Sequence, residues 1–286
     1  MDKIDQQNLE KNIRLLSSQR YFYTQAKKNR ILKLFCGIVL VIFSPIILLL
    51  FPSTKEPLCF IGAFGIIITF VIDFFENSYI KRAANIQEQF DVELYGIEWN
   101  KILLGGKESM EIITTGDNKY KGDRTKLYNW YGNLHGISFP HNVLVCQRSN
   151  LVWDWRLRNK FAIIILLFLT LILGFGTIVG IINKLTLKAY LMGIFIPSIP
   201  ALFFGLKEAI DHFRISQEKK SLMHLTDSLI ERSFIPNSDL RQVQDKIYGL
   251  RIKSALVPDW FYNRYRTEYE QNLEVSNQDF HDRMRK

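Results

Sequence analysis

Apolar and polar positions along this chain are segregated into blocks. Four apolar blocks cover Ile31–Phe51, Pro57–Phe75, Phe161–Ile182 and Leu187–Leu206, and the few charged residues in them lie near their ends. A helix rises about 1.5 Å per residue and the hydrocarbon core of a bilayer is about 30 Å thick, so about 20 apolar residues span it. Core helices of soluble proteins usually keep a polar stripe, which these blocks lack. The pattern therefore predicts four transmembrane helices.

The four blocks pair into two hairpins, because only the short turns 52–56 and 183–186 separate the partners of each pair. Longer polar segments lie between the hairpins and after the second one. The predicted organisation is a cytoplasmic N-terminal helix (1–30), a first hairpin (31–75), a cytoplasmic insert (76–160), a second hairpin (161–206) and a cytoplasmic helical tail (207–286).

The Lys and Arg residues near the block ends predict the orientation, because such residues are retained on the cytoplasmic side. Fourteen lie on the side of the chain ends and the insert, and three lie in or beside the short turns. Both termini and the insert are therefore expected in the cytoplasm, where they can pack together. The fourteen are Arg20, Lys27, Lys28, Arg30, Lys33, Lys81, Arg82, Arg156, Arg158, Lys160, Lys207, Arg214, Lys219 and Lys220, and the three are Lys55, Lys184 and Lys188.

The polar segments are also predicted to be mostly helical, because alternating strand patterns are scarce. Residues 101–123 contain four glycines and are expected to form a loop. Ser238 is expected to cap the helix that follows Pro236. The helices are predicted at 76–100, 124–134, 141–160, 208–233, 239–255 and 260–273. The fold class is therefore all-α.

Composition excludes several classes of function. The net charge of +9 comes with Lys and Arg beside the apolar blocks, which favours a membrane surface over a nucleic-acid duplex. The cysteines Cys36, Cys59 and Cys146 have no CxxC spacing, so neither a zinc site nor a disulfide framework is expected. The polar start of the chain does not resemble a cleavable signal peptide. No phosphate loop or nucleophile motif occurs, so no cofactor and no enzymatic activity are expected.

The apolar blocks themselves argue against a secondary transporter, because no ionisable residue lies at mid-span. They do contain residues that can kink a helix or permit close packing: Ser44, Pro45, Pro197, Ser198 and Pro200. Such residues could line a pore or pack helices, and within one chain packing is favoured. Four helices without a polar stripe cannot enclose a wide aqueous pore, so a channel would need several subunits.

Several polar strings resemble the SMODS-associating four-transmembrane effector family. They are CQRSNLVWDWRLR (Cys146–Arg158), IQEQFDVELYGIEWN (Ile86–Asn100), LRQVQDKIYGLR (Leu240–Arg251) and VPDWFYNRYR (Val257–Arg266). The order of hairpin, insert, hairpin and tail is similar as well. The resemblance implies a bacterial antiphage effector of the inner membrane. A partner nucleotidyltransferase would make a cyclic oligonucleotide messenger, and the effector would bind it, assemble as a homo-oligomer and breach the lipid bilayer.

The resemblance supplies no binding residues, so chemistry alone nominates them. A cyclic oligonucleotide needs cations for its phosphates and aromatic rings for its bases. These are candidates: Arg148, Trp153, Arg251, Trp260 and Arg264. The alternative is structural, with Arg148 paired to Asp154 and the tryptophans anchored at the membrane interface.

Three functions remain open at this stage. The leading one is a ligand-gated effector that disrupts the membrane. The second is a membrane scaffold that does not conduct and recruits a partner through its helical tail. An intramembrane enzyme is weaker, because no charged or nucleophile–base group lies within the bilayer.

Overall fold

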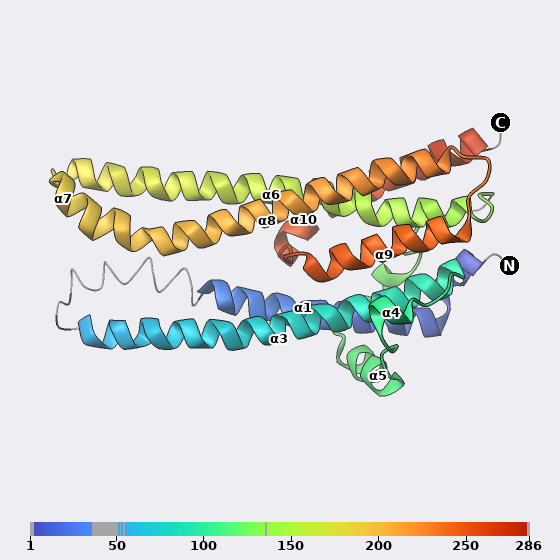
Figure 1. Ribbon diagram of the computed structural model, residues 1–286, viewed down its shortest axis with the longest axis horizontal. Coiled ribbons are helices and arrows are strands. Elements are labelled where there is room, and N and C mark those ends of the chain that lie inside the picture. Colours follow the sequence, from blue (N-terminus) through green and yellow to red (C-terminus); the bar gives the residue numbers. More distant parts are fainter. Residues whose placement is uncertain (1–2, 36–50, 52, 54, 135, 285–286) are drawn as a thin grey trace.

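The computed structural model describes residues 3–35, 51, 53, 55–134 and 136–284, and every regular element among them is a helix (Figure 1). The predicted all-α class is confirmed for these residues. Two pairs of long antiparallel helices form the upper and lower layers in Figure 1, and shorter helices join the layers at the end where both termini lie.

The lower layer pairs α1 (Glu10–Leu34), which follows the short 3-10 helix η1 (Lys3–Asn8), with α3 (Lys55–Tyr95). α3 runs without a break from the predicted second span into the predicted cytoplasmic helix 76–100. It ends before Gly96, whose φ of 67° suits the left-handed residue that terminates many helices. Ile13 and Leu16 of α1 are fully buried in the same core cluster as Phe90 of α3.

The upper layer pairs α6 (His141–Ile182) with α8 (Ile196–Ile230). At the outer end of this pair lie a short helix, α7 (Leu187–Tyr190), and a π-helical turn, η5 (Leu191–Phe195). A Cβ added at Gly205 of α8 would lie 2.7 Å from Leu169 Cδ2 of α6. Ala201, one turn earlier, is buried. These small residues therefore permit close helix packing.

Residues 101–123 were predicted to form a loop, but in the structure part of this segment is helical. They contain α4 (Lys101–Leu104) and α5 (Met110–Lys119), and α5 packs on α1. A Cβ at Gly116 would lie 2.2 Å from Ser18 Oγ, so this glycine is used for close approach between two helices. The 3-10 helix η4 (Arg124–Leu127) follows, and it is shorter than the helix predicted at 124–134.

The C-terminal part consists of α9 (Asn237–Lys253) and α10 (Asp259–Met284). Pro236 precedes α9 as predicted, but Ser238 lies inside the helix and no side chain caps the first turn. The expected Ser238 cap is wrong, because Pro236 itself occupies the N-cap position with an extended backbone. α10 is longer than the predicted helix 260–273 and packs along α6.

One helix in the described part of the chain, His141–Ile182, is long and apolar enough to cross a membrane by length and composition. Only 6% of its most apolar window is buried, whereas a core helix of a soluble protein would be mostly buried. Residues 36–50 of the predicted first span lie outside the described residues. The four-span organisation and its segment boundaries therefore stay predictions.

Candidate ligand cleft

A large cleft opens at the end of the molecule that carries both termini. Its volume is about 1990 Å³, roughly twice the upper end of the range of about 300–1,000 Å³ typical of small-molecule sites. Its walls come from α1, the segment 118–134, the first half of α6, and the connection from α9 into α10. The helices of both layers in Figure 1 therefore contribute to one site.

The cleft walls combine positive charge with aromatic rings. Among the described residues they carry ten Lys or Arg, five Asp or Glu, six tyrosines and two tryptophans. Lys28, Lys119 and Lys121 are exposed on these walls and have no acidic partner in the described part of the chain. The excess of cations favours a ligand with several negative charges.

Arg20 of α1 lies close to two aromatic rings that line the cleft. Its guanidinium carbon is 5.1 Å from the ring centroid of Trp130 and 5.8 Å from that of Tyr262. Lys27, two turns further along α1, forms an ion pair with Asp259 and lies 5.9 Å from the same Tyr262 ring. Guanidinium groups and aromatic rings arranged in this way can stack with nucleobases and bind phosphates.

Polar contacts with the N-terminus hold the aromatic segment 128–134 in the cleft wall. Asn8 donates a hydrogen bond from Nδ2 to Asn129 Oδ1 at 2.8 Å, and its own Oδ1 accepts the backbone N–H of Asn129 at 2.8 Å. Gln7 likewise accepts the backbone N–H of Tyr131 at 2.9 Å and donates to the carbonyl of Gly132 at 3.2 Å. The sequence analysis did not nominate this segment as part of a binding site. Its three closely spaced aromatic residues, Tyr128, Trp130 and Tyr131, are the sequence feature that could have indicated it.

At the inner end of the cleft, two cations share one carboxylate. Asp154 Oδ2 accepts hydrogen bonds from Arg158 Nε at 2.6 Å and from Lys219 Nζ of α8. Arg158 also donates to the carbonyl of Ala255, in the connection between α9 and α10. Asp154, Arg158 and Lys219 all line the cleft. Two cations and one carboxylate give the group a net charge of one positive unit. Such a charge in a protected position is suited to a phosphate.

The pKa values of this group follow from burial and mutual attraction. Burial opposes ionisation of Asp154, but the positive charges of Arg158 and Lys219 outweigh it and lower its pKa. Burial lowers the pKa of Lys219 to about 8, although Asp154 acts in the opposite direction. His212 lies beside this group, with Nδ1 3.3 Å from Arg158 Nη1. Burial and then the charge of Arg158 lower the pKa of His212 to about 2, so this side chain is neutral.

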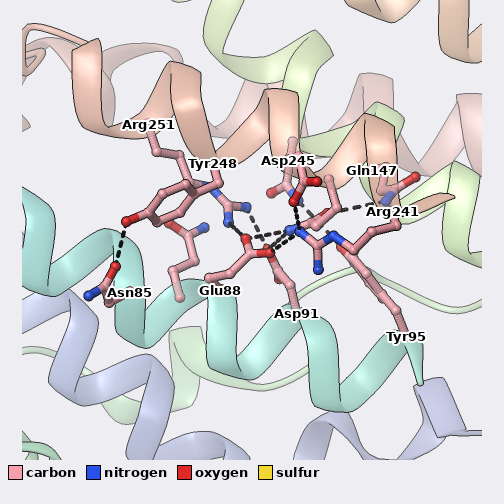
Figure 2. Close-up of polar contacts among 12 residues, drawn as sticks. Asn85, Glu88, Asp91, Tyr95, Gln147, Arg241, Asp245, Tyr248 and Arg251 are labelled. Carbon is pink, nitrogen blue, oxygen red and sulfur yellow. Dashed lines mark hydrogen bonds and ion pairs between the residues drawn. The ribbon is translucent and has the colours of Figure 1, made fainter. Parts of the chain in front are cut away.

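Beside the cleft, α3 and α9 are joined by a buried ionic network (Figure 2). Arg251 Nη2 lies 2.6 Å from Asp91 Oδ2, and its Nη1 lies 3.4 Å from Glu88 Oε2. Arg241 forms a second ion pair with Glu88 at 2.7 Å, and Gln244 donates to both carboxylates. Burial opposes the charge of Arg251, but Asp91 and Glu88 outweigh it and raise its pKa. Burial also raises the pKa of Glu88.

The structure brings two of the five nominated residues into the cleft, Trp153 and Arg251. Trp153 packs edge to face on Tyr262, with ring centroids 5.1 Å apart. Trp260 is 66% exposed, and neither it nor the exposed Arg264 belongs to the cleft walls.

Arg148 is also outside the cleft. It forms an ion pair with Asp227 and lies 5.0 Å from the ring centroid of Phe280. The expected pair between Arg148 and Asp154 is therefore wrong, because each of them has a different partner.

Of the residues that could kink a span, Ser44 and Pro45 lie outside the described residues. Ser198 Oγ donates to the carbonyl of Phe195 at 2.8 Å, which is a contact within the helix. Helix α8 continues through the positions of Pro197 and Pro200 directly after the π-helical turn η5. Such a turn is a known way to accommodate backbone groups that a proline leaves unpaired. No group of metal-binding side chains occurs in the part of the chain that the structure describes.

Comparisons with known proteins agree with the resemblance seen in the sequence. The model of the SMODS-associating 4TM effector domain matches residues 3–280. A protein of Bacillus cereus (strain VD146) described as a "probable CBASS effector molecule" is 34% identical over 277 residues, which cover 91% of each chain. No solved structure matches the chain. The chain therefore belongs to the SMODS-associating 4TM effector family.

Proposed function

We propose that this protein is a messenger-gated effector of an antiphage signalling system, embedded in the inner membrane by four helices with both termini in the cytoplasm. The cleft binds a cyclic oligonucleotide made by a partner nucleotidyltransferase. The liganded protein then assembles as a homo-oligomer and permeabilises the bilayer, so that the infected cell dies. The family and the description of the Bacillus cereus relative support the signalling context.

The observation that carries this proposal is the lining of the cleft. Cyclic oligonucleotides present phosphates and flat bases, and the cleft offers an excess of cations together with eight Tyr or Trp rings among the described residues. The cleft also lies where α1, α6 and the C-terminal helix meet, and α1 and α6 continue from the cleft into the first and second predicted hairpins. A ligand held there touches helices that continue into both predicted hairpins, so it can shift the arrangement of the hairpins if it binds one arrangement more tightly than another.

The apolar surface of the long helices supports contact with lipid. Large side chains on three different helices are about 70% exposed or more, including Phe70 of α3, Leu171 of α6 and Phe203 of α8. A soluble protein would not leave so many on one half of its length. Because these surfaces lack charge, a single copy offers no polar lining for a pore, and we therefore propose an assembly of several copies.

The test uses purified protein in dye-loaded vesicles and a panel of cyclic di- and tri-nucleotides of adenylate or guanylate. We expect one member of the panel to bind and to release the dye. The variant Arg20→Ala should weaken binding by about tenfold or more, because a charge-assisted contact contributes about 1.5–3 kcal/mol. Arg148→Ala and Arg264→Ala lie outside the cleft and should bind normally.

Three results would contradict the proposal. Binding that depends on Arg148 or Arg264 but not on Arg20 would move the site away from the cleft. Binding without dye release would favour the scaffold that recruits a partner through its tail. If the protein releases the dye equally well in the absence of ligand and in the presence of each nucleotide, the proposal that a ligand gates the protein is wrong.

A further inference from the structure

Gln19 of α1 is a polar side chain that keeps very little contact with solvent and has no hydrogen-bond partner among the described residues. It is 2% exposed and lines the cleft, and none of the described residues forms a hydrogen bond with its carboxamide. Buried polar groups in native proteins are nearly always hydrogen-bonded. Because Gln19 lines the cleft, a molecule that enters the cleft is the partner available to its carboxamide.

A second carboxamide, Gln87 of α3, lines the same cleft and is 9% exposed. Its Oε1 accepts the hydroxyl of Tyr23 at 3.3 Å, which leaves the two N–H groups of Nε2 without an acceptor among the described residues. Tyr23 lies one helical turn after Gln19, so both project from the same face of α1. Burial raises the pKa of Tyr23 to about 12, so its hydroxyl remains a donor and keeps Gln87 oriented.

The chemistry of these two side chains differs from that of the rest of the cleft. Phosphates are matched by the surrounding cations, such as Arg158 and Lys219 at the inner end. A carboxamide is neutral and offers a donor beside an acceptor. This is the complement of an adenine edge, where an amino group lies beside a ring nitrogen, and Gln is a common partner of adenine for this reason.

We propose that Gln19 and Gln87 form a base-reading subsite that selects adenine in the bound messenger. This inference rests on the proposed function, because it names the part of the messenger that these residues recognise. Gln19 contributes the paired donor and acceptor, and Gln87 contributes an additional donor. The phosphates then lie toward the cations of the cleft walls, and Trp130, Tyr262 and the neighbouring Arg20 provide stacking surfaces for a base.

The test compares the binding of cyclic di-adenylate, cyclic di-guanylate and the corresponding tri-nucleotides to the full-length protein in detergent. We expect the wild type to prefer the adenylate ligand. Gln19→Met keeps the shape of the side chain but removes its polar atoms, and it should weaken adenylate binding at least tenfold. Gln19→Glu presents two acceptors, which suit the adjacent N–H donors of guanine, and it should shift the preference toward guanylate. Gln217→Met, at an exposed position on α8, is the matched control and should bind like the wild type.

Thermal unfolding without ligand separates this role from a structural one. Removing a buried polar group that has no partner should leave the melting temperature of Gln19→Met unchanged or raised. A lowered melting temperature with unchanged adenylate affinity would mean that a buried water satisfies Gln19, and the subsite would be abandoned. A wild type that prefers guanylate would also overturn the assignment of adenine. A wild type that binds no member of the panel would instead overturn the proposed function itself.

Discussion

Arg251 illustrates what the sequence could and could not say about single residues. Its position in a string of polar residues near Trp260 nominated it as a phosphate ligand. The structure places it among the residues that line the cleft, but it is ion-paired with Asp91 and Glu88, and the side chains of both carboxylates are fully buried. Residue type predicts which chemical groups a side chain can bind, whereas the tertiary fold determines which of them lies beside it. Arg20, with two rings and no carboxylate in the described part of the chain, is the freer cation.

His212 leads to a prediction about pH. Its folded-state pKa of about 2 lies below the usual value of 6.5, because the side chain is buried beside Arg158. As the pH falls below 6.5, His212 takes up a proton in the unfolded chain but stays neutral in the folded protein. The free energy of unfolding therefore decreases on acidification. We expect this residue to cost up to about 1.4 kcal/mol of stability per pH unit between pH 6.5 and 5. Unfolding of the protein in detergent, followed across this range, measures the effect.

The contribution of His212 is isolated by comparing wild type with His212→Gln, which cannot take up a proton. Glu88, whose pKa is raised by burial, acts in the opposite sense on acidification and is present in both proteins. The loss of unfolding free energy between pH 6.5 and 5 should therefore be smaller in His212→Gln than in wild type. His224 is exposed on the same helix, and His224→Gln should behave like wild type. Equal pH dependence in all three proteins would mean that His212 is not buried as described.

Among the helices, local patterns predicted the long ones well and the short ones poorly. α3 and α6 carry uninterrupted periodic or apolar sequence, and each continues as one helix from a predicted span into the adjoining polar segment, where the sequence contains no helix-breaking signal. α5 was missed because Gly116 was interpreted as a loop residue. In the structure this glycine lets α5 approach Ser18 of α1, and such a tertiary reason for a glycine is invisible in a single sequence.

The close approach of α5 to α1 predicts that Gly116→Ala is destabilising. The added Cβ would lie 2.2 Å from Ser18 Oγ and 3.0 Å from Ser18 Cα, so one of the two helices must shift. Overpacking of this kind costs about 1–3 kcal/mol. Protease cleavage within 101–123 should become faster than in wild type, because α5 is less firmly held. At Gly106 an added Cβ meets nothing within 4 Å, so Gly106→Ala is the matched control. Cleavage of both variants at the wild-type rate would show that α5 does not pack on α1.

At the scale of the whole molecule, the apolar blocks predicted two helical pairs, but nothing in the sequence located the cleft. Its walls come from segments that are far apart in the chain, including α1, residues 118–134, α6 and the start of α10. Their meeting depends on long-range contacts such as the one between Asn8 and Asn129, which have no periodic signature. The aromatic residues of 128–134 are visible in the sequence, but the contact between Trp130 and Arg20 depends on the tertiary fold and could not be predicted from it.

The arrangement of the long helices predicts the topology of the protein in the membrane. α6 has 42 residues, so at about 1.5 Å per residue it is about 63 Å long, twice the thickness of the hydrocarbon core. Only one half of it can lie in the bilayer. The apolar half ends at α7, and the polar half lies beside both termini at the opposite end of Figure 1. Residues of this polar half line the cleft. We therefore expect Asn118, in the cleft wall, to share the cytoplasm with the C-terminus, while the turn at 183–186 faces the periplasm.

Reporter fusions at these three positions measure the topology directly. Alkaline phosphatase is active only outside the cytoplasm, so the fusion at 183–186 should be active and those at Asn118 and the C-terminus inactive. A fluorescent protein that matures only in the cytoplasm should give the reverse pattern. Activity of phosphatase at Asn118 would overturn the two-hairpin topology, because the cleft could not then meet a messenger made in the cytoplasm. Inactivity at all three positions would place the turn on the cytoplasmic side as well. The second hairpin would then not cross the bilayer, and the exposed apolar surface of α6 would need another partner.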